Sequence, residues 1–132
     1  MQLHINMVGV ITSRLDEMKA FYRDVLGLPV KLEMDNYVEF EHPGVRFALS
    51  THAVMAEATG HESYTQSPTG QILELAFVVP TPEEVDTAYE AVVAGGATPV
   101  TPPADQPWNQ RTAFFADPDG NIHEIFADLP KT

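Results

Sequence analysis

The chain has 132 residues, of which 7 are basic and 19 are acidic, giving a formal net charge of −12. A chain of this length is one domain that buries a core without cross-links, and its lack of cysteine excludes disulfides, thiolate metal sites and cysteine nucleophiles. The negative charge argues against nucleic-acid and membrane partners, and it favours cationic or neutral small molecules and metal ions.

Apolar periodicity and turn residues predict the elements of the first half in chain order. The apolar, β-branched run at residues 7–12 predicts a strand. A helical pattern over 14–26 follows, with Ser13 as the expected N-cap and Gly27 as the stop before Pro29. Three further short strands are predicted, at residues 30–34, 37–41 and 46–51.

A polar linker over residues 53–70, with room for a short helix near 54–58, precedes a second set of elements. Thr81 followed by Pro82 and, three residues after the threonine, Glu84 predicts a helix start with a capping box. This helix is flanked by predicted strands at residues 72–79, 98–101, 112–116 and 121–127, and the last two are joined by a tight turn at 117–120.

The two halves therefore share a β-α-β-β-β order, and they also match in spacing. Met7 to Tyr22 is about 15 residues, as is Glu74 to Tyr89, which favours a duplicated supersecondary unit. We expect an α+β fold in which two concave mixed sheets form a cleft. The predicted organisation is a single domain over 1–132, with one module at about 3–52, a linker at about 53–70 and a second module at about 71–128.

Two motifs give this pattern a family resemblance. The first is Phe21-Tyr22 followed by Val25-Leu26-Gly27-Leu28, at the end of the first predicted helix. The second is Asp117-Pro118-Asp119-Gly120-Asn121-Ile122-His123-Glu124. In this order, and within a repeated β-α-β-β-β unit, they resemble the glyoxalase/bleomycin-resistance/dioxygenase (vicinal oxygen chelate, VOC) superfamily. The resemblance covers about residues 3–128 and implies two βαβββ modules.

The resemblance also implies four cleft-facing positions, which hold His, Gln or Glu in metal-dependent members. Glu124 falls on the last of them and Glu74 on the one that opens the second half, whereas Met7 and the stretch 47–49 supply no strong ligand. Two carboxylates hold a hard divalent cation weakly, and a thioether is a poor ligand for zinc, nickel or iron. The same pair could instead share a proton as an acid/base pair. In the alternative interpretation, Glu74 is a surface residue paired with Arg111 or a lysine.

Strand parity decides how the nearest histidines are interpreted. His4 and His123 lie an odd number of residues from Met7 and Glu124, and side chains alternate between the two faces of a strand. We therefore expect His4 and His123 to point away from the cleft and to be surface or hydrogen-bonded residues.

Four further residues are candidates for lining a ligand pocket. Met7 and Phe47 would do so from the ligand-equivalent positions, and Trp108 and Arg111 from the segment before the last two strands. Tryptophan offers a flat apolar surface and arginine a planar hydrogen-bonding fork. In the alternative interpretation, Trp108 caps the core and Arg111 neutralises acidic neighbours.

Three functions remain open from the sequence. The first is a glyoxalase-like protein that binds a small molecule in an acidic, partly apolar cleft without a full metal-ligand set, as antibiotic-sequestering members do. The second is a metal-dependent lyase, isomerase or dioxygenase that uses Glu124 and Glu74, and the third is a ligand-free interaction module. We expect no cofactor or a weakly bound divalent metal ion, and a homodimer. A cytoplasmic location is also expected, because the chain lacks cysteine, a signal-peptide pattern and any long apolar run.

Overall fold

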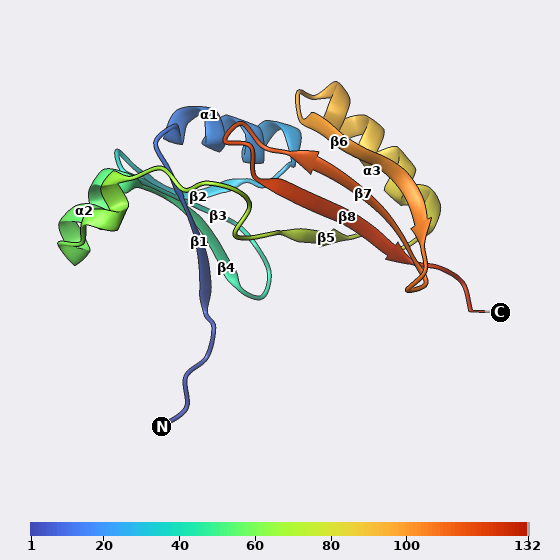
Figure 1. The fold of residues 1–132 in the computed structure, drawn as a ribbon, viewed down its shortest axis with the longest axis horizontal. Coiled ribbons are helices and arrows are strands. Elements are labelled where there is room, and N and C mark those ends of the chain that lie inside the picture. Colours follow the sequence, from blue (N-terminus) through green and yellow to red (C-terminus); the bar gives the residue numbers. More distant parts are fainter. Residues whose placement is uncertain (132) are drawn as a thin grey trace. The chain divides into compact units, whose positions relative to one another are not determined.

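The computed structural model describes residues 1–131, and the chain divides into two compact units (Figure 1). The first unit spans Met1–Thr69, and the second begins at Gly70. Each unit holds one four-stranded mixed sheet. Within residues 1–131, no helix combines the length and the apolar character needed to cross a membrane.

The first unit has a helical segment packed on one face of its sheet, followed by two short helices. The strand order is β1-β4-β3-β2, in which β1 is parallel to β4 and the other neighbours are antiparallel. Its elements are β1 (Met7–Thr12), α1 (Leu15–Ala20), the π-helical turn η1 (Phe21–Val25), β2 (Val30–Met34), β3 (Tyr37–Phe40), β4 (Arg46–Thr51), α2 (His52–Thr59) and the 3₁₀ turn η2 (Glu62–Thr65).

Aromatic packing between the helical segment and the sheet forms the core of this unit. The Tyr22 side chain is fully buried, and its ring centroid lies 5.1 Å from that of Phe47 and 6.0 Å from that of Phe40. Met18 of α1 is also fully buried. Tyr22 thus belongs to the helix–sheet core, and the side of the sheet that carries Phe40 and Phe47 is the helix-facing one.

The second unit repeats the arrangement with a longer helix, α3, along one face of its sheet (Figure 1). The strand order is β5-β8-β7-β6, with β5 parallel to β8 and the other neighbours antiparallel. Val85 of α3 is fully buried, as are Ala113 and Phe115 of β7. The elements are β5 (Ala76–Val78), α3 (Pro82–Ala94), β6 (Thr98–Gln106), β7 (Gln110–Ala116) and β8 (Ile122–Asp128).

The predicted fold class is confirmed, since both units have the β-α-β-β-β order around a mixed four-stranded sheet. One predicted helix cap is wrong. The first helix has Arg14 at its N-cap position with no side-chain cap, and the backbone N–H of Arg14 donates to the Thr12 hydroxyl at 2.9 Å. Because that turn is closed from Thr12, Ser13 does not cap the helix.

The predicted start of α3 is confirmed in detail. The Thr81 hydroxyl accepts a hydrogen bond from the Glu84 backbone N–H at 3.3 Å, and the Glu84 carboxylate accepts one from the Thr81 backbone N–H at 3.0 Å. Pro82 occupies the first turn, where a missing N–H costs nothing. This reciprocal pair satisfies two backbone donors that would otherwise lack a partner inside the helix.

Replacing Thr81 by alanine should destabilise the protein by about 1 kcal/mol, because the Glu84 N–H loses its side-chain acceptor. Urea unfolding followed by circular dichroism measures the change. Thr87→Ala is the matched control: it removes an exposed threonine from the middle of the same helix, where alanine has the higher helix propensity. Equal losses in the two variants would contradict the capping role.

Candidate functional site

The candidate site lies on the face of the second sheet that points away from α3, called here the helix-distal face. His123 and Ile125 of β8 are buried toward the helix side, so Glu124 between them points to the opposite side. Across the β5–β8 pair, Ala76 is the register partner of Glu124. Glu74 lies two residues before Ala76 and therefore shares the face of Glu124.

The two carboxyl groups predicted from the sequence are thus brought together within one unit. Partial burial, the negative charge of Glu74 and a hydrogen bond with Glu74 raise the pKa of Glu124 above its usual range. Burial and a like charge both disfavour the ionised form, so Glu124 holds a proton more tightly than an isolated glutamate. Glu74 itself is exposed, which leaves the pair accessible to a ligand.

Apolar side chains surround the pair. Phe114 of β7 is the register partner of Glu124, and Ile122 and Phe126 lie two residues to either side of it along β8. All three are half-buried, which leaves part of each side chain open to a ligand. The helix-distal face therefore presents two carboxyl groups on an apolar, partly aromatic surface.

Arg111, the arginine that the sequence suggests as a partner for Glu74, does not neutralise this pair. Its guanidinium donates to Asp86 of α3 at 2.7 Å and to Asp105 of β6 at 3.0 Å, so it lies on the helix side of the sheet. There it lines two shallow hollows of about 270 and 360 Å³, both shared with Asp86. The proposed pairing of Glu74 with Arg111 is therefore not what the structure shows.

The other three pocket candidates lie in a turn of the second unit and in the first unit. Trp108 is 59% exposed in the β6–β7 turn, where its indole N–H donates to the Gln110 side chain at 3.1 Å. Met7 and Phe47 belong to the first unit. Phe47 is only 5% exposed because it packs on Tyr22, so it does not line the helix-distal face of its own sheet.

The first sheet carries a polar cluster that sequence reasoning missed. Glu39 is 4% exposed, yet it accepts two hydrogen bonds from the Arg46 guanidinium, at 2.6 and 2.9 Å, and one from the Tyr37 hydroxyl at 2.7 Å. The Tyr37 oxygen also lies 3.5 Å from the Met7 sulfur, which places Met7 beside this cluster. The alternation of Tyr37 and Glu39 in one strand was the available signal, since it puts both on one face.

Ion pairing makes this cluster electrostatically different from the carboxyl pair. The hydrogen bonds from Arg46 and Tyr37 lower the pKa of Glu39 to about 2, and pairing with Glu39 raises the pKa of Arg46. Glu39 and Arg46 therefore cancel each other's charge. Glu74 and Glu124 have no such cation in the ion pairs found among residues 1–131, so their face is the one suited to a cationic ligand.

The donor set does not fit a tightly held transition metal. Among residues 1–131, no three His, Cys, Asp or Glu side chains are grouped so that they could hold a metal ion. Structural and catalytic zinc sites use three or four protein ligands. Glu74 and Glu124 alone supply two carboxyl groups, which suits a proton, an organic cation or a weakly held hard cation.

Replacing Glu74 by glutamine should lower the pKa of Glu124, because the repelling charge is removed and the new amide can donate to the ionised carboxylate. Carbon-13 NMR of labelled glutamates follows this titration, with Glu57→Gln in α2 as a control that should leave it unchanged.

A raised folded-state pKa contributes stability that is present at low pH and lost as the pH rises through it. Glu124→Gln should therefore remove this pH-dependent loss of stability. In the titration experiment, a Glu124 pKa that is unchanged in Glu74→Gln would contradict the pairing.

Comparison with known proteins agrees with this fold. The model of the Glyoxalase/Bleomycin resistance protein/Dioxygenase superfamily matches residues 4–125. The uncharacterized protein YraH of Bacillus subtilis is 34% identical over 113 residues, which are 83% of this chain and 86% of that protein.

Solved structures show the same likeness. A glyoxalase/bleomycin resistance protein/dioxygenase from Nocardioides has a TM-score of 0.89 at 34% identity, covering 100% of this chain and 87% of that one. A lactoylglutathione lyase from Agrobacterium tumefaciens has a TM-score of 0.75 at 25% identity, covering 94% of this chain and 92% of that one. The chain therefore belongs to the glyoxalase/bleomycin resistance protein/dioxygenase superfamily.

Proposed function

We propose that this chain binds a small organic cation with an apolar body on the helix-distal face of the second sheet. The observation that carries the proposal is the contact between the Glu74 and Glu124 carboxyl groups, which have no neutralising cation among the described ion pairs. A primary or secondary ammonium group would donate to both carboxylates. The apolar part of the ligand would lie on Phe114, Ile122 and Phe126.

Two further facts support this choice of ligand. The net charge of −12 attracts cations and repels anions, and this effect extends over about one Debye length from the surface. The family name includes bleomycin resistance proteins, and the resemblance implies members that sequester cationic antibiotics. Sequestering such a molecule needs binding without chemistry, which two carboxyl groups and an apolar surface provide.

A charge series tests this proposal by calorimetry. Phenethylammonium is the cationic probe, 2-phenylethanol its neutral analogue and 3-phenylpropionate its anionic one, with metal-free bleomycin as the larger ligand. Cations should bind most tightly, and Glu124→Gln should weaken their binding by about ten- to a hundredfold, since one charge-assisted hydrogen bond is worth about 1.5–3 kcal/mol. Cation affinity should also fall as the pH drops through the raised pKa of Glu124.

Glu57→Gln provides the matched control, because it removes the same charge from an exposed position in the first unit. Its affinity for phenethylammonium should equal that of the wild type. Binding that ignores probe charge, or that survives in Glu124→Gln and Glu74→Gln, would contradict the proposal. A complete lack of binding by all probes would instead favour the ligand-free interaction module.

A metal-dependent lyase, isomerase or dioxygenase is the second candidate, and two observations favour it. The Glu74–Glu124 pair supplies two oxygen ligands, and the chain resembles a lactoylglutathione lyase structure at 25% identity. Against it stands the absence of a third grouped ligand within residues 1–131. Native mass spectrometry after incubation with Ni²⁺, Zn²⁺, Mn²⁺ and Mg²⁺ separates the two candidates: stoichiometric uptake that is lost in Glu124→Gln would favour the enzyme.

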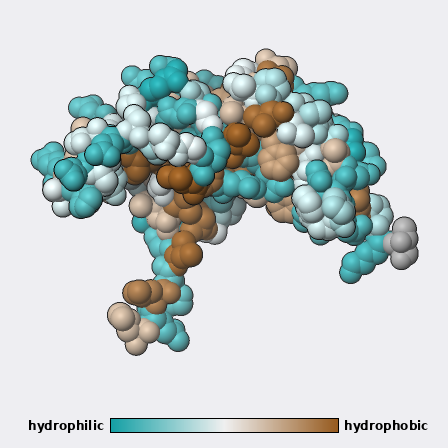
Figure 2. Space-filling view, viewed as in Figure 1, coloured by the Kyte–Doolittle hydropathy of each residue, from teal (hydrophilic) through white to brown (hydrophobic). Residues whose placement is uncertain are grey.

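The expected homodimer has one supporting feature in the first unit. Met1, Leu3 and Ile5 alternate with polar residues ahead of β1 and are each more than 80% exposed, and Figure 2 shows apolar atoms along this N-terminal segment. An exposed apolar row of this kind is typical of a surface that another chain covers. The cytoplasmic location expected from the composition stays a prediction.

Light scattering coupled to size exclusion measures the mass in solution, and we expect that of two chains. Leu3→Glu should shift the mass toward one chain, because a carboxylate in a buried apolar contact is costly. Gln2→Glu, which adds the same charge at the alternate position, is the control and should leave the mass unchanged. A single-chain mass for the wild type would contradict the dimer.

A further inference from the structure

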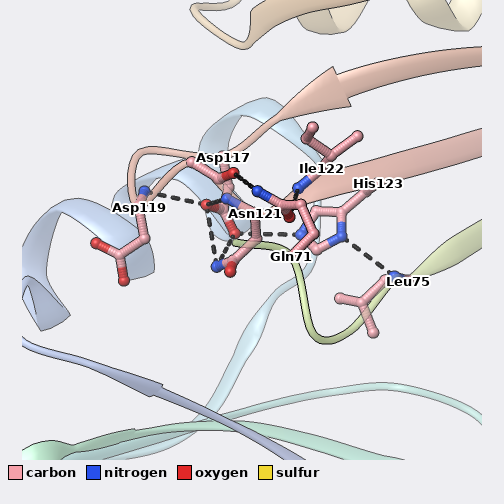
Figure 3. Close-up of polar contacts among 8 residues, drawn as sticks. Gln71, Leu75, Asp117, Asp119, Asn121, Ile122 and His123 are labelled. Carbon is pink, nitrogen blue, oxygen red and sulfur yellow. Dashed lines mark hydrogen bonds and ion pairs between the residues drawn. The ribbon is translucent and has the colours of Figure 1, made fainter. Parts of the chain in front are cut away.

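The segment that carries Glu74 is held to β8 by side chains in place of a regular strand ladder. Residues 71–75 precede β5. Gln71 bonds to the backbone at the start of β8: its side-chain amide donates to the Gly120 carbonyl at 2.8 Å and accepts from the Ile122 N–H at 2.9 Å. The Leu75 N–H donates to the Nδ1 atom of His123 at 3.2 Å (Figure 3). These two anchors bracket Glu74.

The bond from Leu75 determines the protonation of His123. Because a backbone N–H donates to Nδ1, that nitrogen carries no proton, and the single proton of the neutral ring lies on Nε2. Nε2 is 3.1 Å from a carboxylate oxygen of Asp117, to which it donates. Both side chains are fully or almost fully buried, at 0% and 2% exposure, so the ring is fixed in orientation.

The Asp117 carboxylate is in turn fixed by the turn that it begins. It accepts hydrogen bonds from the backbone N–H groups of Asp119 and Asn121, both at 3.0 Å, and from the Asn121 side-chain amide at 2.9 Å. One series of hydrogen bonds therefore runs from Asp117 in the turn through His123 to Leu75. A second bond joins Gly120 of the same turn to Gln71. Figure 3 shows these side chains gathered around the turn that precedes β8.

We propose that Gln71 and His123 are positioning residues that hold the Glu74 carboxyl group against that of Glu124. This inference rests on the proposed function, because it concerns how the cation-binding pair is assembled. Besides these anchors, the backbone bond that joins this segment to β8 in the described part of the chain runs from the Glu124 N–H to the Leu75 carbonyl at 2.9 Å, just before β5. Loss of an anchor therefore frees Glu74 to move away from Glu124 while β5 stays paired.

Gln71 gives the cleaner test because it is exposed, so its substitution leaves the core intact. Gln71→Met has nearly the same length but cannot make either hydrogen bond. In this variant, the pKa of Glu124 should fall part of the way toward its value in Glu74→Gln, and phenethylammonium affinity should drop severalfold. Gln66→Met, at an exposed glutamine in the first unit, is the control and should change neither quantity.

A double-mutant comparison separates positioning from a general loss of structure. If Gln71 acts through Glu74, then Gln71→Met should leave the Glu124 titration unchanged once Glu74→Gln is already present. A nonspecific loosening would shift that titration in both backgrounds and would overturn the proposal. Thermal unfolding of each variant confirms that the compared proteins are folded.

His123 is tested with two substitutions, of which only one can accept the hydrogen bond from the Leu75 N–H. Asparagine places a carbonyl oxygen near the position of Nδ1 and can still accept from Leu75, whereas leucine cannot. His123→Asn should therefore keep the raised pKa of Glu124 better than His123→Leu. An unmoved Glu124 titration in Gln71→Met and His123→Leu, alongside a clear shift in Glu74→Gln, would overturn the positioning role and leave the proposed cation site intact. An unmoved titration in Glu74→Gln would overturn the cation site itself.

Discussion

The buried carboxylate of Asp117 is the group on which the candidate site of the second unit depends. A charge at 2% exposure is tolerated only when donors surround it, and Asp117 accepts from two backbone N–H groups, the Asn121 amide and His123. These bonds close the turn before β8 and orient the imidazole. Through that imidazole, a local turn controls where a segment about fifty residues earlier in the chain is placed.

The chemistry of the site follows from this placement. Glu124 would be an ordinary half-buried strand residue if Glu74 were elsewhere. With Glu74 beside it, Glu124 binds a proton more tightly than it would alone, and the two carboxyl groups lie together on an apolar surface. The pKa of Glu39 shifts in the opposite direction: Arg46 and Tyr37 lower the pKa of this more deeply buried glutamate to about 2. The partners, more than the depth of burial, decide the direction of the shift.

Much of this could be predicted from the sequence where the signal is local or periodic. The capping box at Thr81 and Glu84 involves residues three apart, so their types sufficed. The inward-facing His123 follows from the two-residue period of strands, and the family resemblance implies the shared face of Glu74 and Glu124. The fold itself followed from the repeated order of elements together with the family motifs.

The sequence predicts less where a side chain takes over a role normally played by the backbone, or where a contact joins residues from different elements. The strand predicted at 72–79 is regular only over Ala76–Val78, because Gln71 and His123 replace the first ladder bonds. Phe47 was placed on the cleft side, although in the structure its ring packs on Tyr22. No local pattern indicates that the Glu39 carboxylate would meet Arg46 across two strands.

The most direct test of the central claim is the separation of the Glu74 and Glu124 carboxyl oxygens in a high-resolution crystal structure, solved at a pH below the raised pKa of Glu124. The two groups should share a proton, with oxygens about 2.5–2.7 Å apart. Carboxyl groups that point away from each other, with no shared proton and no bridging cation, would contradict it.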